Sequence, residues 1–300
     1  MFGFPGHNLT QVRILLLSNE SSGSSDSQVV ASIGQELSAL GSVTSVVPSS
    51  LESFDEEVSH AARDADLLVV AGGDGTVNCA VNALRDALGP VKFALVPMGT
   101  GNDLARTLEV SRDPLEAARA IVSGTERSID VWRARGQGVD RFFINACMGG
   151  FPVEVNESID EDLKRKVGPL AFVIGGARGA ADMARYRVTI DGKELDDCIA
   201  AGVGNGQTCG GGVRVWPQAD PSDGLLDACV LSAEGVGDTL KLAATVRSGR
   251  HTGLEEVVTL QAGRIEISSE PAMEFNLDGE LVELVTPVTF EGAGSITMRV

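Results

Sequence analysis

Residues 67–78 read LLVVAGGDGTVN, an apolar run that ends in glycines and leads into a helix-forming stretch. The run Leu67–Ala71 is entirely apolar and predicts a buried strand. Glycines such as Gly72, Gly73 and Gly75 let backbone N–H groups approach a ligand, and the N-terminus of the following helix favours an anion. The pattern therefore indicates a phosphate-binding loop between a strand and a helix.

Asp74 makes this loop more specific. A carboxylate among phosphate-binding amides is repelled by the phosphates unless a divalent cation lies between them, so the loop predicts a metal–nucleotide site. The alternative is that Asp74 only caps the N-terminus of a helix that begins near Thr76. The loop is not a Walker A motif, because it lacks the Gly-Lys-Ser/Thr ending.

A second motif of the same kind occupies residues 93–106, which read FALVPMGTGNDLAR. A predicted strand, Phe93–Val96, is followed by a glycine-rich turn with Thr, Asn and Asp, and then by the start of a helix. Two such turns at the carboxyl ends of parallel strands are expected to converge on one crevice, where open α/β sheets bind their ligands.

The first part of the chain alternates strands with helix-length stretches. Strands joined by crossover helices pair in parallel, so residues 1–129 predict an α/β domain with a mostly parallel sheet. The predicted strands are 12–17, 43–47, 67–71 and 93–96, and the predicted helices are 28–40, 54–63, 76–88, 104–108 and 114–123.

After Ile129 the pattern changes to strands joined by turns. Hairpin signals such as Asp191-Gly192 favour antiparallel pairing, so residues 130–300 predict a β-sandwich domain with helical insertions. Its predicted strands are 129–134, 141–146, 186–190, 198–203, 226–231, 257–260, 264–268, 274–277 and 281–285, and its predicted helices are 159–184 and 237–248.

The charge balance excludes some classes of partner. The chain has 300 residues with 24 Lys and Arg against 42 Asp and Glu, which gives a net charge of −18 and disfavours nucleic-acid binding. The five cysteines form no C-x-x-C pair, and residues 1–10 lack the pattern of a signal peptide, so we expect a cytoplasmic protein. A basic cluster that runs from Lys164 to Arg187 predicts either peripheral contact with the inner face of the membrane or a solvated helix face.

Two acidic turns lie in the second half of the chain. Asp223-Gly224 follows the Gly210–Gly212 segment and, taken alone, is read more simply as a plain turn. Asp278-Gly279-Glu280 also fits a hairpin turn, but its two carboxylates suit metal binding or proton abstraction from a hydroxyl group.

These motifs together resemble a known family. In order and spacing they are similar to the bacterial soluble diacylglycerol kinases with their YegS-like lipid kinases, which are relatives of sphingosine kinases and, more remotely, of NAD kinases. The motifs are Gly72–Thr76, Pro97–Arg106, Gly210–Gly212, Asp223–Asp227 and Asp278–Glu280.

The resemblance implies a kinase that uses ATP and Mg²⁺ and phosphorylates a lipid substrate at the membrane surface. It assigns the proton-accepting role to Glu280, with Asp278 as a metal or hydroxyl partner and Asp74 acting through magnesium. It implies a structural magnesium site at Asp223 with the backbone of Asp220 and Leu225. The implied nucleotide-binding residues are Asn19, Gly72, Gly73, Asp74, Gly75, Thr76, Asn78, Gly99, Thr100, Asn102, Asp103 and Arg106.

Departures from the family pattern keep two other functions open. The first loop, Ser18–Gly23, lacks the basic residue that is usual there, and Pro48–Phe54 replaces a typical Gly-His-Ala segment. The alternatives are a kinase for a soluble hydroxyl compound, NAD included, and a nucleotide-binding regulatory protein without turnover. Retention of Asp74, Asp223 and the Asp278–Glu280 pair argues against the second of these. The sequence also leaves open whether the protein forms a homodimer.

Overall fold

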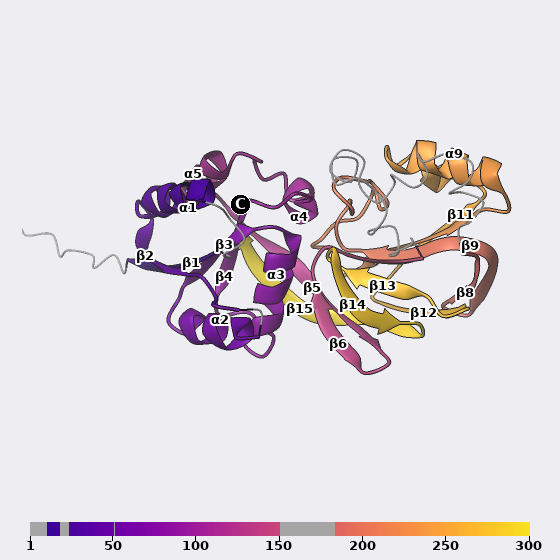
Figure 1. The fold of residues 1–300 in the computed structure, drawn as a ribbon, viewed down its shortest axis with the longest axis horizontal. Helices are drawn as coiled ribbons and strands as arrows, with labels where there is room; N and C mark the ends of the chain where they lie inside the picture. The colour runs from indigo at the N-terminus through magenta and orange to yellow at the C-terminus, as the bar shows by residue number, and fades with distance from the viewer. Residues whose placement is uncertain (1–10, 19–23, 51, 151–183) are drawn as a thin grey trace, which may run out of the picture.

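The computed structural model describes residues 11–18, 24–50, 52–150 and 184–300, and it shows two lobes side by side (Figure 1). One lobe is α/β with parallel strands, and the other is an antiparallel β-sandwich, which confirms the fold class expected from the sequence. All but the last residue of the predicted helix at 159–184 lies outside the described residues, as do Asn19 and most of the basic cluster.

The α/β lobe is built on a parallel sheet in the order β2 (Gly41–Val46), β1 (Val12–Ser18), β3 (Leu67–Gly72), β4 (Lys92–Pro97). All of β3 is buried, as its apolar sequence requires. The strand that carries the first glycine motif is therefore the centre of the lobe, and its carboxyl end lies beside that of β4.

Helices cover both faces of this sheet (Figure 1). Val69 of β3 packs in the cluster under α1 and α5, whereas Val70 packs in the cluster under α2 and α3, because successive side chains of a strand point to opposite faces. The helices of the lobe are α1 (Ser24–Leu37), α2 (Phe54–Ala62), α3 (Asp74–Ala83), α4 (Asp103–Thr107) and α5 (Pro114–Ser123).

The β lobe holds the remaining strands, and all their described pairings within the lobe are antiparallel. Its main core contains Trp132, Phe275 and Phe290, and Phe143 meets Phe290 edge to face at 5.9 Å between ring centroids. The strands are β5 (Glu126–Gly136), β6 (Val139–Phe143), β7 (Ala146–Gly149), β8 (Tyr186–Ile190), β9 (Lys193–Gly204), β10 (Leu226–Ser232), β11 (Val257–Ala262), β12 (Arg264–Glu270), β13 (Glu274–Leu277), β14 (Glu280–Val285) and β15 (Val288–Arg299).

A second, smaller core lies on the outer side of β9 and β10. Leu242 and Val246 of α9 (Val236–Val246) pack there against Trp216, close to the 3₁₀ helix η3 (Arg250–Gly253). These two strands therefore have apolar neighbours on both faces.

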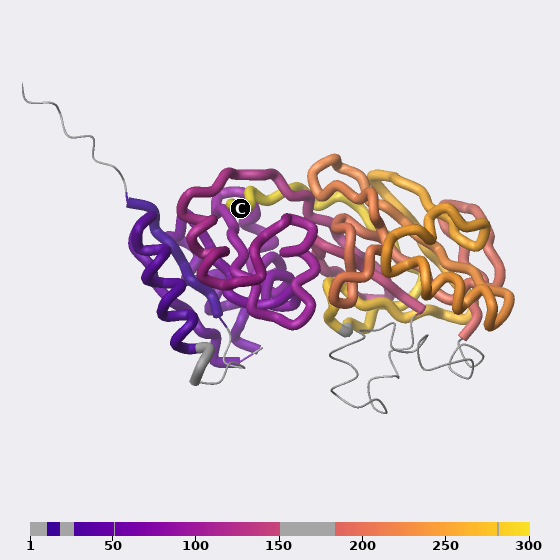
Figure 2. Tube along the Cα trace, turned by 90° about the horizontal axis from the view of Figure 1, so that it is seen from above, coloured from indigo at the N-terminus to yellow at the C-terminus, as the bar shows by residue number. Residues whose placement is uncertain are grey.

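Strand β15 joins the two lobes. It pairs antiparallel with β12 and β5 and parallel with β4, where Met298 lies opposite Phe93. Figure 2 shows this strand, in yellow, passing from the β lobe into the α/β lobe, where the chain ends. The sequence did not predict β15, because Gly292 and Gly294 interrupt its apolar pattern.

One predicted strand was wrong in extent. The strand expected at 141–146 is two strands, β6 and β7, separated by Ile144 and Asn145. The backbone N–H groups of these two residues donate to the buried carboxylate of Asp278 instead of pairing with a neighbouring strand. This break brings part of the β lobe to the end of α3.

Candidate functional site

The two glycine-rich loops meet at the carboxyl ends of β3 and β4, as the sequence predicts. A Cβ atom added to Gly99 would lie 2.6 Å from the Cα atom of Gly73, so only glycines allow this approach. Asn102 shapes the second loop from a left-handed conformation, with φ at 52°. Its side chain accepts the N–H of Gly99 at 3.0 Å and donates to the carbonyl of Gly99 at 2.6 Å.

The carboxylate of Asp74 fastens the first loop to the second. It accepts the N–H of Asp103 at 3.0 Å and the N–H of Leu104 at 3.0 Å, and so caps α4. The alternative in which Asp74 caps its own helix is wrong, because α3 begins at Asp74 and its N-cap residue is Gly73. Burial raises the pKa of Asp74 to about 6 despite these bonds, and the charges of Asp103 and Asp278 add to the rise.

Glu280 of the β lobe lies directly against the first loop. A Cβ atom added to Gly75 would overlap the carboxylate oxygen Oε1 of Glu280, so this carboxylate occupies the space left by the missing side chain. Glu280 is an exposed residue at the start of β14. A solvent-accessible carboxylate is thus placed on the phosphate-loop candidate by the other lobe.

Asp278, two residues earlier, is buried, with a side chain only 3% exposed. Its carboxylate accepts four N–H groups at 2.8–3.0 Å: Asn78 Nδ2 and the backbone of Ile144, Asn145 and Ala146. Burial raises its pKa above the ordinary value, and the four hydrogen bonds act against that rise. The Asp278 turn is therefore buried and bonded to other segments of the chain, unlike the simple hairpin turn that the sequence allowed.

Asp103 makes a second connection between the lobes. Its carboxylate accepts the hydroxyl of Thr208 at 2.8 Å and the N–H of Gly211 at 2.8 Å. Arg106 supports the same turn by donating to the carbonyl of Gly101 at 3.3 Å. The sequence singled out Asp103, Arg106 and the Gly210–Gly212 segment, but it missed Thr208, which carries no local signal.

Asn82 is a further residue that the sequence missed. It lies one turn after Asn78 on α3, donates to the Asn78 Oδ1 atom at 3.1 Å and accepts the N–H of Phe142 at 2.9 Å. Two asparagines at i and i+4 on an otherwise apolar helix could have indicated a buried polar network.

Other predicted site residues are placed near the loops without strong contacts. Thr100 is exposed. Thr76 folds back over Gly72, since a Cβ atom there would be 2.7 Å from the Thr76 hydroxyl oxygen. Thr100 therefore lies on the second loop and Thr76 in the first turn of α3.

The predicted structural metal turn is held by its own residues and by Asp130, which accepts the N–H of Gly224 at 2.7 Å. Asp223 accepts the N–H of Leu225 at 2.9 Å, and Asp220 accepts the N–H of Ser222 at 3.0 Å. Burial raises the pKa of nearby Asp130, and the charges of Asp223 and Asp220 raise it further. In the part of the chain that the structure describes, no group of three or more His, Cys, Asp or Glu side chains could hold a metal ion. The metal site at this turn stays a prediction.

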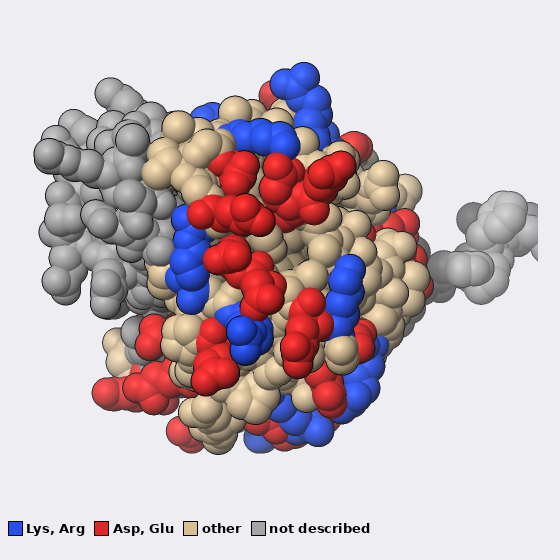
Figure 3. Space-filling model, turned by 90° about the vertical axis from the view of Figure 1, so that its right-hand side faces the viewer, with Lys and Arg blue, Asp and Glu red and all other residues tan. Residues whose placement is uncertain are grey.

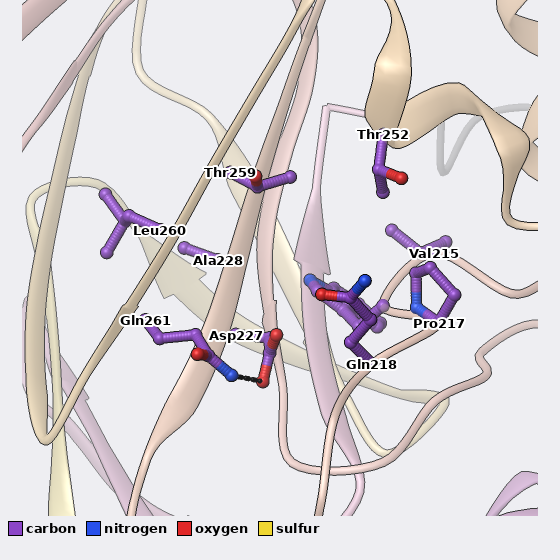
Figure 4. A pocket seen from close by; sticks show the side chains of 10 residues that line it. Val215, Pro217, Gln218, Asp227, Ala228, Thr252, Thr259, Leu260 and Gln261 are labelled. Carbon is purple, nitrogen blue, oxygen red and sulfur yellow. Dashed lines mark hydrogen bonds between the residues drawn. The ribbon is translucent and has the colours of Figure 1, made fainter.

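A surface cavity of about 220 Å³ lies elsewhere on the β lobe (Figure 4). Val215 and Pro217 form part of its wall, and Gln261 of β11 donates to Asp227 of β10 at 3.0 Å within it. Burial raises the pKa of Asp227, with a contribution from the charge of Asp223. No residue of the two glycine loops lines this cavity, so it is separate from the candidate site.

The far end of the β lobe is rich in acidic side chains (Figure 3). The hairpin between β8 and β9 carries four exposed acidic residues, Asp191, Glu194, Asp196 and Asp197. This end of the molecule is therefore poorly suited to an anionic membrane surface. None of the helices in the described ranges combines the length and the apolar run needed to cross a bilayer.

Two family models cover most of the chain. The model of the diacylglycerol kinase catalytic domain matches residues 13–134, and the model of the YegS C-terminal NAD kinase beta sandwich-like domain matches residues 146–296. The first match covers the α/β lobe and most of β5, and the second covers the β lobe from β7 to most of β15.

Individual relatives agree with the family models. The Stenotrophomonas maltophilia protein named probable lipid kinase YegS-like is 35% identical over 76% of this chain and 75% of its own length. The diacylglycerol kinase of Bacillus subtilis is 30% identical over 75% of this chain and 76% of its own length. A crystal structure from Bacillus anthracis, of a protein assigned to the diacylglycerol kinases, is 27% identical, superposes with a TM-score of 0.81 and covers 96% of each chain. The chain therefore belongs to the family of YegS-like lipid kinases and diacylglycerol kinases, which are phosphotransferases.

Proposed function

We propose that this lipid kinase transfers the γ-phosphoryl group of ATP, with Mg²⁺, to the hydroxyl group of a membrane lipid such as diacylglycerol. The observation that carries the proposal is the carboxylate of Glu280 lying against Gly75 of the phosphate-loop candidate. The name of the Bacillus subtilis relative supports diacylglycerol as the acceptor. Because the proposed substrate is a membrane lipid, we propose that the enzyme is cytoplasmic and contacts the inner face of the membrane.

The first turn of α3 is suited to the phosphates. Its N-cap residue, Gly73, has no side chain to satisfy the first N–H groups of the helix. Free N–H groups and the positive end of the helix dipole favour an anion there. The close contact between Gly73 and Gly99 keeps side chains out of the same space.

The donor set near the loop fits a magnesium ion that arrives with the nucleotide. Magnesium in kinases is held by one or two carboxylates together with phosphate oxygens, and seldom by a cage made of protein alone. Asp74 is a half-buried carboxylate with a pKa of about 6, so a cation beside it would stabilise its ionised form. When bound, the ion neutralises charge on the phosphates.

Glu280 has the position expected of a general base. We propose that it accepts the proton of the lipid hydroxyl group as that oxygen bonds to the γ-phosphorus atom. The bond from this phosphorus to the β–γ bridging oxygen breaks, and its electron pair leaves with ADP. Positioning and charge neutralisation supply most of the catalysis in such transfers.

The test is a kinase assay with radiolabelled ATP and a lipid extract, with the product identified by mass spectrometry. We expect label in the organic phase. Label only in an aqueous product, for example from NAD, would support a soluble acceptor. Nucleotide binding without any product would support the regulatory alternative.

Two variants test the role of Glu280. Glu280→Gln should lower kcat by about 10²–10⁴-fold and leave ATP binding nearly unchanged, because it removes the base and keeps the shape. Gly75→Ala should also lower kcat, because the new methyl group displaces the carboxylate. Gly34→Ala on α1 is the matched control, since its added Cβ atom would meet only Leu16 at an ordinary 3.7 Å. Near-normal turnover of Glu280→Gln would move the proton-accepting role elsewhere.

A further inference from the structure

The carboxylate of Asp278 has no free acceptor position. An ionised carboxylate offers about four lone-pair sites, and here four N–H groups use them. Oδ2 accepts from Asn78 and Ile144, and Oδ1 accepts from Asn145 and Ala146. A metal ion or a substrate hydroxyl group therefore finds no lone pair on this side chain. The role that the resemblance implies for Asp278, a metal or hydroxyl partner, does not suit this geometry.

The four donors come from both lobes. Asn78 belongs to α3, the helix whose first turn carries the glycine motif. Residues 144 and 145 connect β6 and β7, and Ala146 begins β7. The backbone N–H of Asp278 also donates to the carbonyl of Ala146 at 2.8 Å. The turn between β13 and β14 is thereby fixed both to α3 and to the β lobe.

Glu280 follows this turn directly, and it touches the same helix one turn earlier. Gly75, which meets the Glu280 carboxylate, is three residues before Asn78, so the two contacts lie on adjacent turns of α3. Asp278 and Glu280 together hold α3 at two successive turns.

We propose that Asp278 is a positioning residue of the kinase, which sets the place of the Glu280 carboxylate on Gly75 by joining the β13–β14 turn to Asn78 and to residues 144–146. The proposal rests on the proposed function, in which Glu280 accepts the proton. Asp278 itself contacts neither nucleotide nor lipid. A displacement of about 1 Å in a reacting group can lower a rate by about 10²-fold, so the loss of this joint should be visible in kcat.

The main experiment compares Asp278→Asn, Asn78→Ala and the double variant in the lipid kinase assay. The amide of Asp278→Asn turns an NH₂ group toward N–H donors, so we expect kcat to fall about 10–100-fold, with KM for ATP and the Mg²⁺ concentration at half-maximal rate unchanged. Asn78→Ala should lower kcat in the same way and to a smaller degree. The double variant should lose less than the product of the single losses, because both changes break the bond between Asn78 and Asp278.

The control for lost stability is Thr286→Val. Thr286 is also buried and its hydroxyl accepts the N–H of Met273 at 2.9 Å, so the control also leaves a buried backbone N–H without a partner, away from α3. It should retain wild-type kcat. If Asp278→Asn does not fold, Asn78→Ala removes the bond to Asp278 from its other side, together with the bond from Asn78 to the carbonyl of Phe142.

A second measurement does not depend on lipid phosphorylation. Burial raises the pKa of the Cys79 thiol on α3, and the charge of Glu280 raises it further. If Asp278→Asn lets the Glu280 carboxylate move away, Cys79 should react faster with iodoacetamide, as it should in Glu280→Gln. Peptide mass spectrometry separates Cys79 from the other cysteines, and Thr286→Val should show the wild-type rate.

The outcomes separate the two proposals. If a high Mg²⁺ concentration restores the kcat of Asp278→Asn, Asp278 is a metal ligand, and the positioning role is overturned. Normal kcat and normal Cys79 reactivity in both Asp278→Asn and Asn78→Ala would also overturn it. A wild-type protein that phosphorylates no lipid, but whose Asp278→Asn variant shows faster Cys79 alkylation, would refute the proposed acceptor and support the positioning of Glu280.

Discussion

Two of the Asp-Gly turns in the β lobe, at Asp278 and at Asp223, have opposite surroundings. Asp278 before Gly279 is buried and accepts four N–H groups from other parts of the chain. Asp223 before Gly224 is exposed and accepts the N–H of Leu225, two residues later. The carboxylate of Asp278 therefore joins distant segments, whereas that of Asp223 makes a local bond, although the backbone of its turn also bonds to Asp130. What differs is which donors the fold brings to the carboxylate.

The strongest test of this difference is the loss of each side chain. Asp278→Ala leaves four buried N–H groups without an acceptor, so we expect it to lower the free energy of unfolding by about 3–5 kcal/mol. Asp223→Ala removes one bond at the surface and should change it by less than about 1 kcal/mol. Urea denaturation of both variants measures the two values, and equal losses would contradict the comparison.

Asp74 sharpens the comparison as an intermediate case, because its side chain is half-buried and accepts only two N–H groups. Burial raises its pKa from 3.8 to about 6, so the folded protein holds this proton more tightly than the unfolded chain. The stability that this proton contributes is complete below pH 4 and is lost as the pH rises through 6, by about 3 kcal/mol in total.

The measurement for Asp74 is the free energy of unfolding of the wild type and of Asp74→Asn, without metal, from pH 4 to pH 7. Groups other than Asp74 titrate in both proteins, so the difference between the two curves isolates it. We expect the wild type to lose stability relative to the variant over this range. A difference that does not change with pH would show that two hydrogen bonds balance the burial of Asp74.

The smallest expected effect comes from the glycines of the two turns. Gly279 and Gly224 have φ values of 87° and 74°, and an added Cβ atom at either would meet nothing within 4 Å. Gly279→Ala and Gly224→Ala should therefore each cost about 1–2 kcal/mol of backbone strain and should agree with each other. Thermal unfolding measures both losses of stability. A far larger loss of stability in Gly279→Ala than in Gly224→Ala would show that the two turns differ in their backbone and not only in their aspartates.

The local parts of the site were predictable from the sequence. The apolar run before Gly72 and the glycines after it indicated β3, its loop and α3, and Pro114 at the first position of α5 marked the start of that helix. Residues 93–106 likewise indicated a strand, a loop and a helix start, which the structure has as β4 and α4. Each of these features depends on residues that are close together in the chain.

The long-range parts were not predictable in this way. Asp74 caps a helix that begins 29 residues later, and Asn78 bonds to Asp278 across 200 residues. No local pattern distinguishes the buried turn at Asp278 from the exposed one at Asp223. The contact between Gly75 and Glu280 also depends on the placement of one lobe on the other, which only the folded chain defines.

The pairing of β15 with β4 determines when the sheet of the α/β lobe can be completed during synthesis. A nascent chain that has just completed α5 has β4 as an open sheet edge, because the strand that covers it, Val288–Arg299, is made only after β5 to β14. Residues 1–129 alone would keep that edge unpaired and would be prone to pair with other chains. The lobe that carries the glycine loops therefore reaches its final sheet only after the β lobe has been translated, so both lobes are expected to mature together.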